Sequence, residues 1–198
     1  QDIYLTGNPQ ITYFKIVYRR HTNFSMESIR QLFHSNPDFG STNVCTISRT
    51  GDLMYKTYVQ VTLPAITVET EKKFRWLNWI GHILIKRVDI KIGGDVIDTH
   101  YSQWLHIWNE LSQKPGLKEG YANMVGNVPR LTQYATGNTG GTNTIDIPET
   151  TIYIPLQFWF CRNPGLAIPL IALQYHDTRI DIEFRSANEC INLSGESA

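Results

Sequence analysis

Two stretches of the chain alternate between apolar and polar residues with a period of two, and this pattern restricts the fold more than any other. In Thr178–Phe184, the side chains of Ile180, Ile182 and Phe184 share one face, and charged residues take the other. Tyr55–Leu63 alternates in the same way. Successive side chains of a strand point to opposite faces of a sheet, so the pattern is typical of β-strands with one buried face. Both stretches are therefore predicted to be strands.

Runs of β-branched and aromatic residues between turn signals predict further strands. These runs are Asn43–Arg49, Thr151–Phe160 and Leu170–Tyr175. Residues 82–98 predict a hairpin, because Gly93-Gly94 can adopt the positive φ of a tight turn between two β-prone segments. The apolar face of this hairpin is expected to hold Leu84, Val88, Ile90 and Ile92.

The first expected strand, Ile11–Arg19, is apolar on both faces. Tyr13 and Val17 lie on one face, and Phe14 and Ile16 lie on the other. A strand with one solvated face should alternate instead, so the outer face is expected to be covered by another domain or subunit. Tyr13 and Val17 are therefore candidate interface residues.

Two arginines, Arg19 and Arg20, end this strand within the stretch YRRHTNF. Neighbouring strand residues face opposite ways, so the two side chains cannot form one cationic patch by themselves. We expect at least one of them to bind a carboxylate or a carbonyl group at the end of the sheet sandwich predicted below, or on a neighbouring sandwich. The planar guanidinium suits this role because it presents a fork of N–H donors.

One amphipathic helix is predicted over His100–Gln113, where apolar residues recur at spacings of three and four. Thr99 is the expected N-cap, and Pro115-Gly116 is expected to end the helix. The stripe that should face the core comprises Tyr101, Trp104, Leu105, Trp108 and Leu111.

Three segments lack a clear period. Thr67–Trp76 is polar and predicts a short helix or an exposed loop, and the region from about 117 to 149 is rich in Gly, Asn and Thr and predicts a long surface loop. The tail Ser186–Ala198 is interpreted as a linker or terminus. About eight strands remain, and they predict an all-β fold: an eight-stranded antiparallel jelly-roll sandwich with a decorating helix and a long loop.

Composition argues against several classes of protein. Lys plus Arg and Asp plus Glu number 18 each, so no basic excess favours direct nucleic-acid binding. No apolar run is long enough for a membrane span. Cys45, Cys161 and Cys190 are few and widely spaced, which predicts reduced, mostly buried thiols rather than a disulfide framework or zinc cluster. Reduced thiols indicate assembly in a reducing compartment.

No catalytic, cofactor or metal site is predicted. The chain has no phosphate-binding glycine loop and no G-x-S-x-G nucleophile motif. Asp98 and His100 could share a strand face, so a cupin-like metalloenzyme remains a minor alternative. A second alternative is a glycan-binding jelly-roll module in which exposed tryptophans stack on sugars.

Three long blocks carry a resemblance to a known family: LTGNPQITYFKIVYRRHTNFSMESI, IGHILIKRVDIKIGGDVIDTHYSQWLHIWNEL and PLQFWFCRNPGLAIPLIALQYHDTRIDIEF. Together they resemble the N-terminal half of the major capsid protein of nucleocytoplasmic large DNA viruses. The resemblance extends from about Tyr4 to Arg185.

The resemblance implies a double jelly roll, of which this chain would be the first barrel. It implies an N-terminal domain over 1–187 and a linker over 188–198 toward a second jelly roll of the same polypeptide. Three copies would form a pseudo-hexagonal capsomer of an icosahedral shell, with minor capsid proteins as further partners. The expected location is the virion, after assembly in the host cytoplasm. The family has no catalytic residues to transfer.

Overall fold

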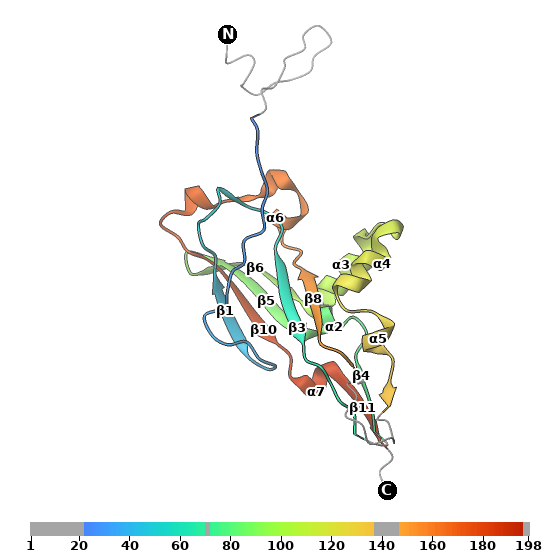
Figure 1. Ribbon diagram of the computed structural model, residues 1–198. Coiled ribbons are helices and arrows are strands. Elements are labelled where there is room, and N and C mark those ends of the chain that lie inside the picture. Colours follow the sequence, from blue (N-terminus) through green and yellow to red (C-terminus); the bar gives the residue numbers. More distant parts are fainter. Residues whose placement is uncertain (1–21, 70–71, 137–146, 196–198) are drawn as a thin grey trace, which may run out of the picture. The chain divides into compact units, whose positions relative to one another are not determined.

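The computed structural model describes residues 22–69, 72–136 and 147–195 (Figure 1). The chain divides into two compact units, Gln1–Arg30 and Gln31–Ala198. In the first unit, the described residues 22–30 contain neither helix nor strand. The elements below all belong to the second unit.

Four of the residues singled out by sequence lie outside the described residues. They are Tyr13, Val17, Arg19 and Arg20, together with the strand expected at Ile11–Arg19. Their roles at an interface or at the end of the sandwich stay predictions.

The largest sheet has four antiparallel strands in the order β1-β10-β5-β6. Its strands are β1 Thr42–Thr46, β10 Thr178–Phe184, β5 Ile85–Ile92 and β6 Asp95–Tyr101. The alternation predicted for β10 is confirmed, since Ile180, Ile182 and Phe184 are buried. The β5–β6 hairpin is confirmed from Ile85 onward, with φ of 65° and 101° at Gly93 and Gly94. Residues 82–84, including Leu84, belong instead to the helix α2 Ile80–Leu84.

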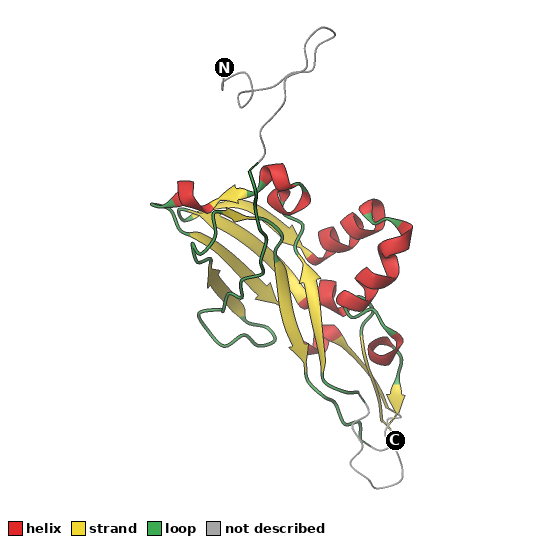
Figure 2. Cartoon of the chain, turned by 45° about the horizontal axis from the view of Figure 1, so that its top comes forward, coloured by secondary structure: helices red, strands yellow, loops and turns green. Residues whose placement is uncertain are grey.

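A second layer is formed by β3 Tyr58–Leu63 and β8 Thr150–Pro155, which pair antiparallel. Val59 and Leu63 point inward and are buried, whereas Tyr58 and Gln60 are exposed, as the alternation predicted. The inward side chains join those of the four-stranded sheet in one hydrophobic core. Figures 1 and 2 show the β3–β8 pair packed across the larger sheet.

The third sheet corrects two predictions. It has the order β11-β4-β7, with β4 Lys72–Trp76, β11 Ile191–Gly195 and β7 Ala135–Thr136. The segment predicted as a short helix or loop is therefore largely the strand β4. Its Phe74 and Trp76 are buried, but two lysines precede Phe74 and Arg75 separates the two rings, so the apolar alternation is too short to predict a strand.

The tail also differs from its interpretation as a linker. Ala187–Cys190 forms α7, begun by a capping box between Ser186 and Glu189, and β11 then pairs with β4. Pairing across more than a hundred residues of sequence leaves no local signal in the tail itself.

Residues 117–136 are not the continuous loop that was predicted. They contain α4 Lys118–Met124, α5 Pro129–Thr132 and β7, after the short 3₁₀ turn η1 Pro115–Leu117. Residues 137–146, at the centre of the Gly-rich stretch, lie outside the described residues. The helices escaped prediction because each is too short for a stable apolar period.

The remaining elements are short. They are α2 Ile80–Leu84, α3 Ser102–Ser112, β2 Leu53–Met54, β9 Ile168–Pro169, α6 Trp159–Arg162, η2 Pro164–Leu166 and η3 Leu170–Leu173. Two strand predictions are thus corrected. The strand predicted over Thr151–Phe160 ends at Pro155. The strand predicted over Leu170–Tyr175 is replaced by the 3₁₀ turn η3 and the turn residues after it, and Leu170 alone is buried there.

The described part of the chain is mostly sheet with several helices, and its buried side chains form one core. The three cysteines are free and buried, and burial raises the pKa of each thiol. Within the described residues, no helix is both long and apolar enough to cross a membrane.

Candidate interaction surface

Helix α3 turns most of its apolar residues away from the core. Trp104 is 36% exposed, Ile107 49% and Leu111 82%. With Trp108, they form a continuous stripe at helical spacing, here named the α3 stripe. An exposed apolar row of this kind marks an interaction surface.

The opposite side of α3 faces the core and is largely polar. Its buried residues are Ser102, Leu105 and Asn109. The prediction that Tyr101, Trp104 and Leu111 pack on the core is therefore wrong, since Tyr101 is also exposed and ends β6, while that for Leu105 is confirmed. Periodicity reveals that a helix has an apolar stripe, but it does not show whether the stripe's partner lies inside the same chain.

A cation holds the two indoles of the α3 stripe in place. The Arg162 guanidinium lies 4.0 Å from the ring centroid of Trp108 and 5.8 Å from that of Trp104. Its Nε and Nη2 donate to the carbonyl of Gln157 at 3.1 and 2.9 Å. The guanidinium is thus oriented by the backbone before α6 and covers one face of Trp108.

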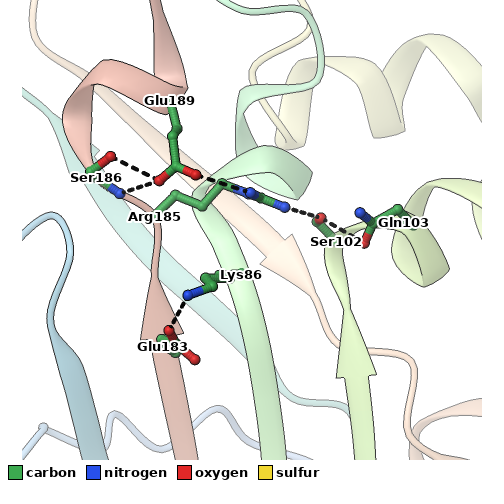
Figure 3. A network of polar contacts seen from close by, with 7 residues as sticks. All are labelled: Lys86, Ser102, Gln103, Glu183, Arg185, Ser186 and Glu189. Atoms are coloured by element: carbon green, nitrogen blue, oxygen red, sulfur yellow. Dashed lines mark hydrogen bonds and ion pairs between the residues drawn. The ribbon is translucent and has the colours of Figure 1, made fainter.

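The first turn of α3 is fixed by the polar network in Figure 3. Arg185 Nη2 donates to the Ser102 hydroxyl at 3.0 Å, and Arg185 Nη1 lies 3.4 Å from Glu189. The backbone N–H and hydroxyl of Ser186 donate to the same carboxylate, at 3.1 and 2.8 Å. These bonds, first those from Ser186, lower the pKa of Glu189. The network ties α3 to the end of β10 and to α7.

The predicted N-cap of α3 is wrong. The N-cap residue is Tyr101, and no side chain caps the helix. Thr99 belongs to β6, and its hydroxyl donates to the Asp89 carboxylate at 2.7 Å. The strand continues to Tyr101, three residues beyond the end of the predicted hairpin at residue 98.

Four rings join α3 to α2 and α4 beneath the stripe. We name Trp79, His82, His106 and Tyr121 the ring cluster. Trp79 stacks on His82 with centroids 5.4 Å apart, and His106 meets His82 edge-on at 5.8 Å. His82 Nε2 and the Tyr121 hydroxyl are 2.8 Å apart.

The described ranges were predicted to hold no metal site. They contain no group of three or more His, Cys, Asp or Glu side chains that could hold a metal ion. The pair considered for a cupin-like site, Asp98 and His100, has its Oδ2 and Nε2 atoms 3.8 Å apart. Burial lowers the pKa of His100, whose ring packs edge-on against Phe158.

Sequence reasoning missed Arg162 and the ring cluster as parts of a surface. Ile107 could have been found, because it completes the spacing of the stripe. The contact between Arg162 and Trp108 joins residues far apart in sequence, so it carried no local signal.

Comparisons with known proteins agree with this architecture. Residues 12–198 match the family model described as major capsid protein N-terminus. The chain is 49% identical over 208 residues to the major capsid protein of Phaeocystis pouchetii virus, covering 96% of this chain and 40% of that protein. It is 51% identical over 203 residues to that of Pyramimonas orientalis virus, covering 100% of this chain and 47% of that protein.

Solved structures are similar as well. The PBCV-1 VP54 crystal structure, fitted into a reconstruction of the virophage Sputnik, matches with a TM-score of 0.69 and 30% identity, over 92% of this chain and 43% of that one. The Faustovirus major capsid protein matches with a TM-score of 0.54 at 15% identity, over 94% of this chain and 49% of that one, and shows likeness of fold alone. The chain spans less than half the length of these relatives. It belongs to the family of the major capsid protein N-terminus of large DNA viruses.

Proposed function

We propose that this chain is the N-terminal jelly roll of a structural capsid protein that self-associates to build a virus shell. The observation that carries the proposal is the α3 stripe on a chain of this family. The stripe exposes aromatic and aliphatic side chains while its base is fixed by the Arg185 network. An apolar surface held rigid in this way is suited to burial by a partner, because little side-chain entropy remains to be lost.

Membership of the family supports a finer architecture as part of this proposal. In this proposal, the described sheets belong to the first of two eight-stranded jelly rolls, and the second jelly roll follows in the same polypeptide. Three polypeptides form a pseudo-hexagonal capsomer, and capsomers tile an icosahedral shell with the help of minor capsid proteins. The site of action is the virion, after assembly in the host cytoplasm, and the chain has no enzymatic role.

The balanced charge of the chain supports this function. With 18 basic and 18 acidic residues, copies of the chain can approach each other without strong net repulsion. Several of the charged groups pair within the chain, including Lys86 with Glu183 and Lys91 with Asp181, each at 2.6 Å. Apolar contact rather than ionic attraction is therefore expected to drive association.

A glycan-binding module is less well supported. Stacking on a sugar requires an open aromatic face, and Arg162 occupies one face of Trp108. The same contact is compatible with protein association, because arginine and tryptophan together form frequent energetic centres of interfaces.

The test compares two isoleucine substitutions in the complete capsid polypeptide. Ile107→Ser alters the α3 stripe, and Ile171→Ser alters an isoleucine in η3 that is 73% exposed. We expect trimers by sedimentation for the wild type and for I171S, and a loss of trimer for I107S of at least roughly tenfold in association constant. A wild-type polypeptide that stays monomeric at high concentration, under conditions where virions are stable, would contradict the proposed function. Equal trimerisation of both variants would contradict the role of α3.

A further inference from the structure

The ring cluster lies where α2, α3 and α4 meet, and it contains two imidazoles without an acidic partner. His82 is 2% exposed, and Nδ1 of both His82 and His106 is buried with no hydrogen-bond partner in the described structure. Asn109, one turn after His106 on α3, likewise has a buried Oδ1 without a partner there. A buried polar atom left unpaired is costly, so this junction is the least satisfied part of the helical region.

The backbone at the junction is strained. Trp79 has φ 59° and ψ 41°. Among the described residues, no other non-glycine residue has a positive φ. A bulky residue occupies this left-handed region only when its surroundings impose it. Here the indole stacks on His82 and meets His106 edge-on, and the backbone N–H of Trp79 donates to the side-chain oxygen of Asn127 at 3.3 Å.

The titratable groups around His82 offer no counter-charge. Those on the elements packed against α2 are His106 and Glu110 of α3, Lys118, Glu119 and Tyr121 of α4, Glu189 and Cys190 of α7, Tyr153 of β8, and Lys86, Arg87, Asp89 and Lys91 of β5.

Their contacts leave His82 without a carboxylate. Glu110 pairs with Lys118 at 3.7 Å, and Glu189 is engaged by Arg185 and Ser186. Asp89 binds Arg87 at 2.9 Å. His106 faces the His82 ring, so a second positive charge would add repulsion rather than relief.

Protonation therefore opposes the folded arrangement in a direct way. Burial, with a smaller contribution from His106, lowers the pKa of His82 to about 4. Burial also raises the pKa of Tyr121, so the hydroxyl stays protonated and can donate to neutral His82 Nε2. If Nε2 accepts from Tyr121, the neutral ring carries its hydrogen on Nδ1, where no acceptor lies, and an added proton turns Nε2 from an acceptor into a donor. In the other tautomer, Nε2 carries the hydrogen, and the added proton goes to Nδ1, a site with no acceptor. The stacked indole of Trp79 offsets only part of this cost.

We propose that the ring cluster is an acid-sensitive latch, which holds α3 and its stripe on the body of the chain at neutral pH and releases them when the buried His82 is protonated. The regulatory meaning, loosening of shell contacts by acid, rests on the proposed function. The latch itself is a property of the isolated chain. Any state in which α3 has opened exposes His82 and binds the proton more tightly, so lowering the pH from 6.5 toward 4 shifts the equilibrium toward opening.

Hydrogen exchange of the 198-residue chain tests the latch between pH 7 and about pH 4. Protection factors, corrected for the intrinsic pH dependence of exchange, are compared for α3, α4, β5 and β10. For the wild type, we expect protection in α3 and α4 to fall at least roughly tenfold on acidification, while β5 and β10 keep theirs.

His82→Gln removes the proton site, so its acid response in α3 and α4 should disappear. His34→Gln, at an exposed histidine, is the matched control and should respond as the wild type does. If H82Q does not fold, His106→Gln replaces it and should show a smaller response than the wild type. An unchanged response in these variants, or loss of protection in β5 and β10 at the same pH, would overturn the proposal.

The two proposals fail separately. Trimers without an acid response in exchange leave the shell function standing and remove the latch. An acid response in a polypeptide that never forms trimers keeps the latch and removes its role in the shell.

Discussion

The four-stranded sheet and helix α3 both have an apolar and a polar side, but they orient them oppositely. In β10, the isoleucines face the core, and outward Asp181 and Glu183 pair with lysines of β5. In α3, Ser102 and Asn109 face inward, while Trp104 and Leu111 face outward. Strand β10 thus satisfies both of its sides within the described chain, whereas the apolar side of α3 is exposed. In the proposed function, this difference locates the part of the chain that associates.

The largest expected effect separates the two apolar faces. Ile182→Ala removes a buried side chain from β10 and should lower the free energy of unfolding by about 2–4 kcal/mol. Leu111→Ala, on the α3 stripe, should change it by less than about 0.5 kcal/mol in the isolated chain. Urea denaturation measures both. Similar losses of unfolding free energy in the two variants would mean that the α3 stripe is covered within the chain. The contrast between β10 and α3 would then be wrong.

The second prediction concerns the pH dependence of stability. The pKa of His82 is about 4 in the folded chain and near 6.5 when exposed, so its neutral form stabilises the fold fully above pH 6.5. That stability is lost as the pH falls from 6.5 to about 4, by up to roughly 3 kcal/mol. Denaturation series at several pH values should show this slope in the wild type and in His34→Gln. A slope of the same size in His82→Gln would assign it to other groups.

Two helical glycines give the third prediction. A Cβ on Gly81 of α2 would lie 2.8 Å from the carbonyl oxygen of Val125, so Gly81→Ala should destabilise the chain by about 1–3 kcal/mol. Gly120 of α4 has nothing within 4 Å of the same position, and Gly120→Ala should stabilise it by up to about 1 kcal/mol. Thermal denaturation of the pair measures how tightly α2 is packed. Equal changes in stability for the two variants would show that the backbone around Gly81 and Val125 shifts to accept a methyl group at little cost.

The smallest expected effect is at Arg162. Arg162→Lys retains the charge but loses the planar stack on Trp108, and it should cost less than about 1 kcal/mol. Near-ultraviolet circular dichroism should nevertheless change, because the indoles lose a fixed neighbour. Arg130→Lys, at an exposed position on α5, is the control and should leave the spectrum unchanged. Identical spectra for both variants would show that Arg162 does not order the stripe.

Sequence patterns predicted the sheet better than the helical region, for a physical reason. In β10, the alternation of apolar and polar residues lies within the strand that it predicts, and in the β5–β6 hairpin, the two glycines lie within the turn that they predict. The strand β11 and the contact of Arg162 with Trp108 depend on partners far along the chain. For α3, the spacing of apolar residues was detected correctly, but the buried side was assigned by assuming that apolar residues always face the chain's own core. That assumption is wrong for α3, whose apolar stripe is exposed on the described chain.

The bond from Arg185 to Ser102 also imposes an order on biosynthesis. It spans 83 positions, so the first turn of α3 cannot be fastened until most of this chain has left the ribosome. At about 5–20 residues per second, the stripe is made several seconds before its anchor. Nascent chains therefore carry the exposed apolar stripe of α3 without its Arg185 anchor during that interval.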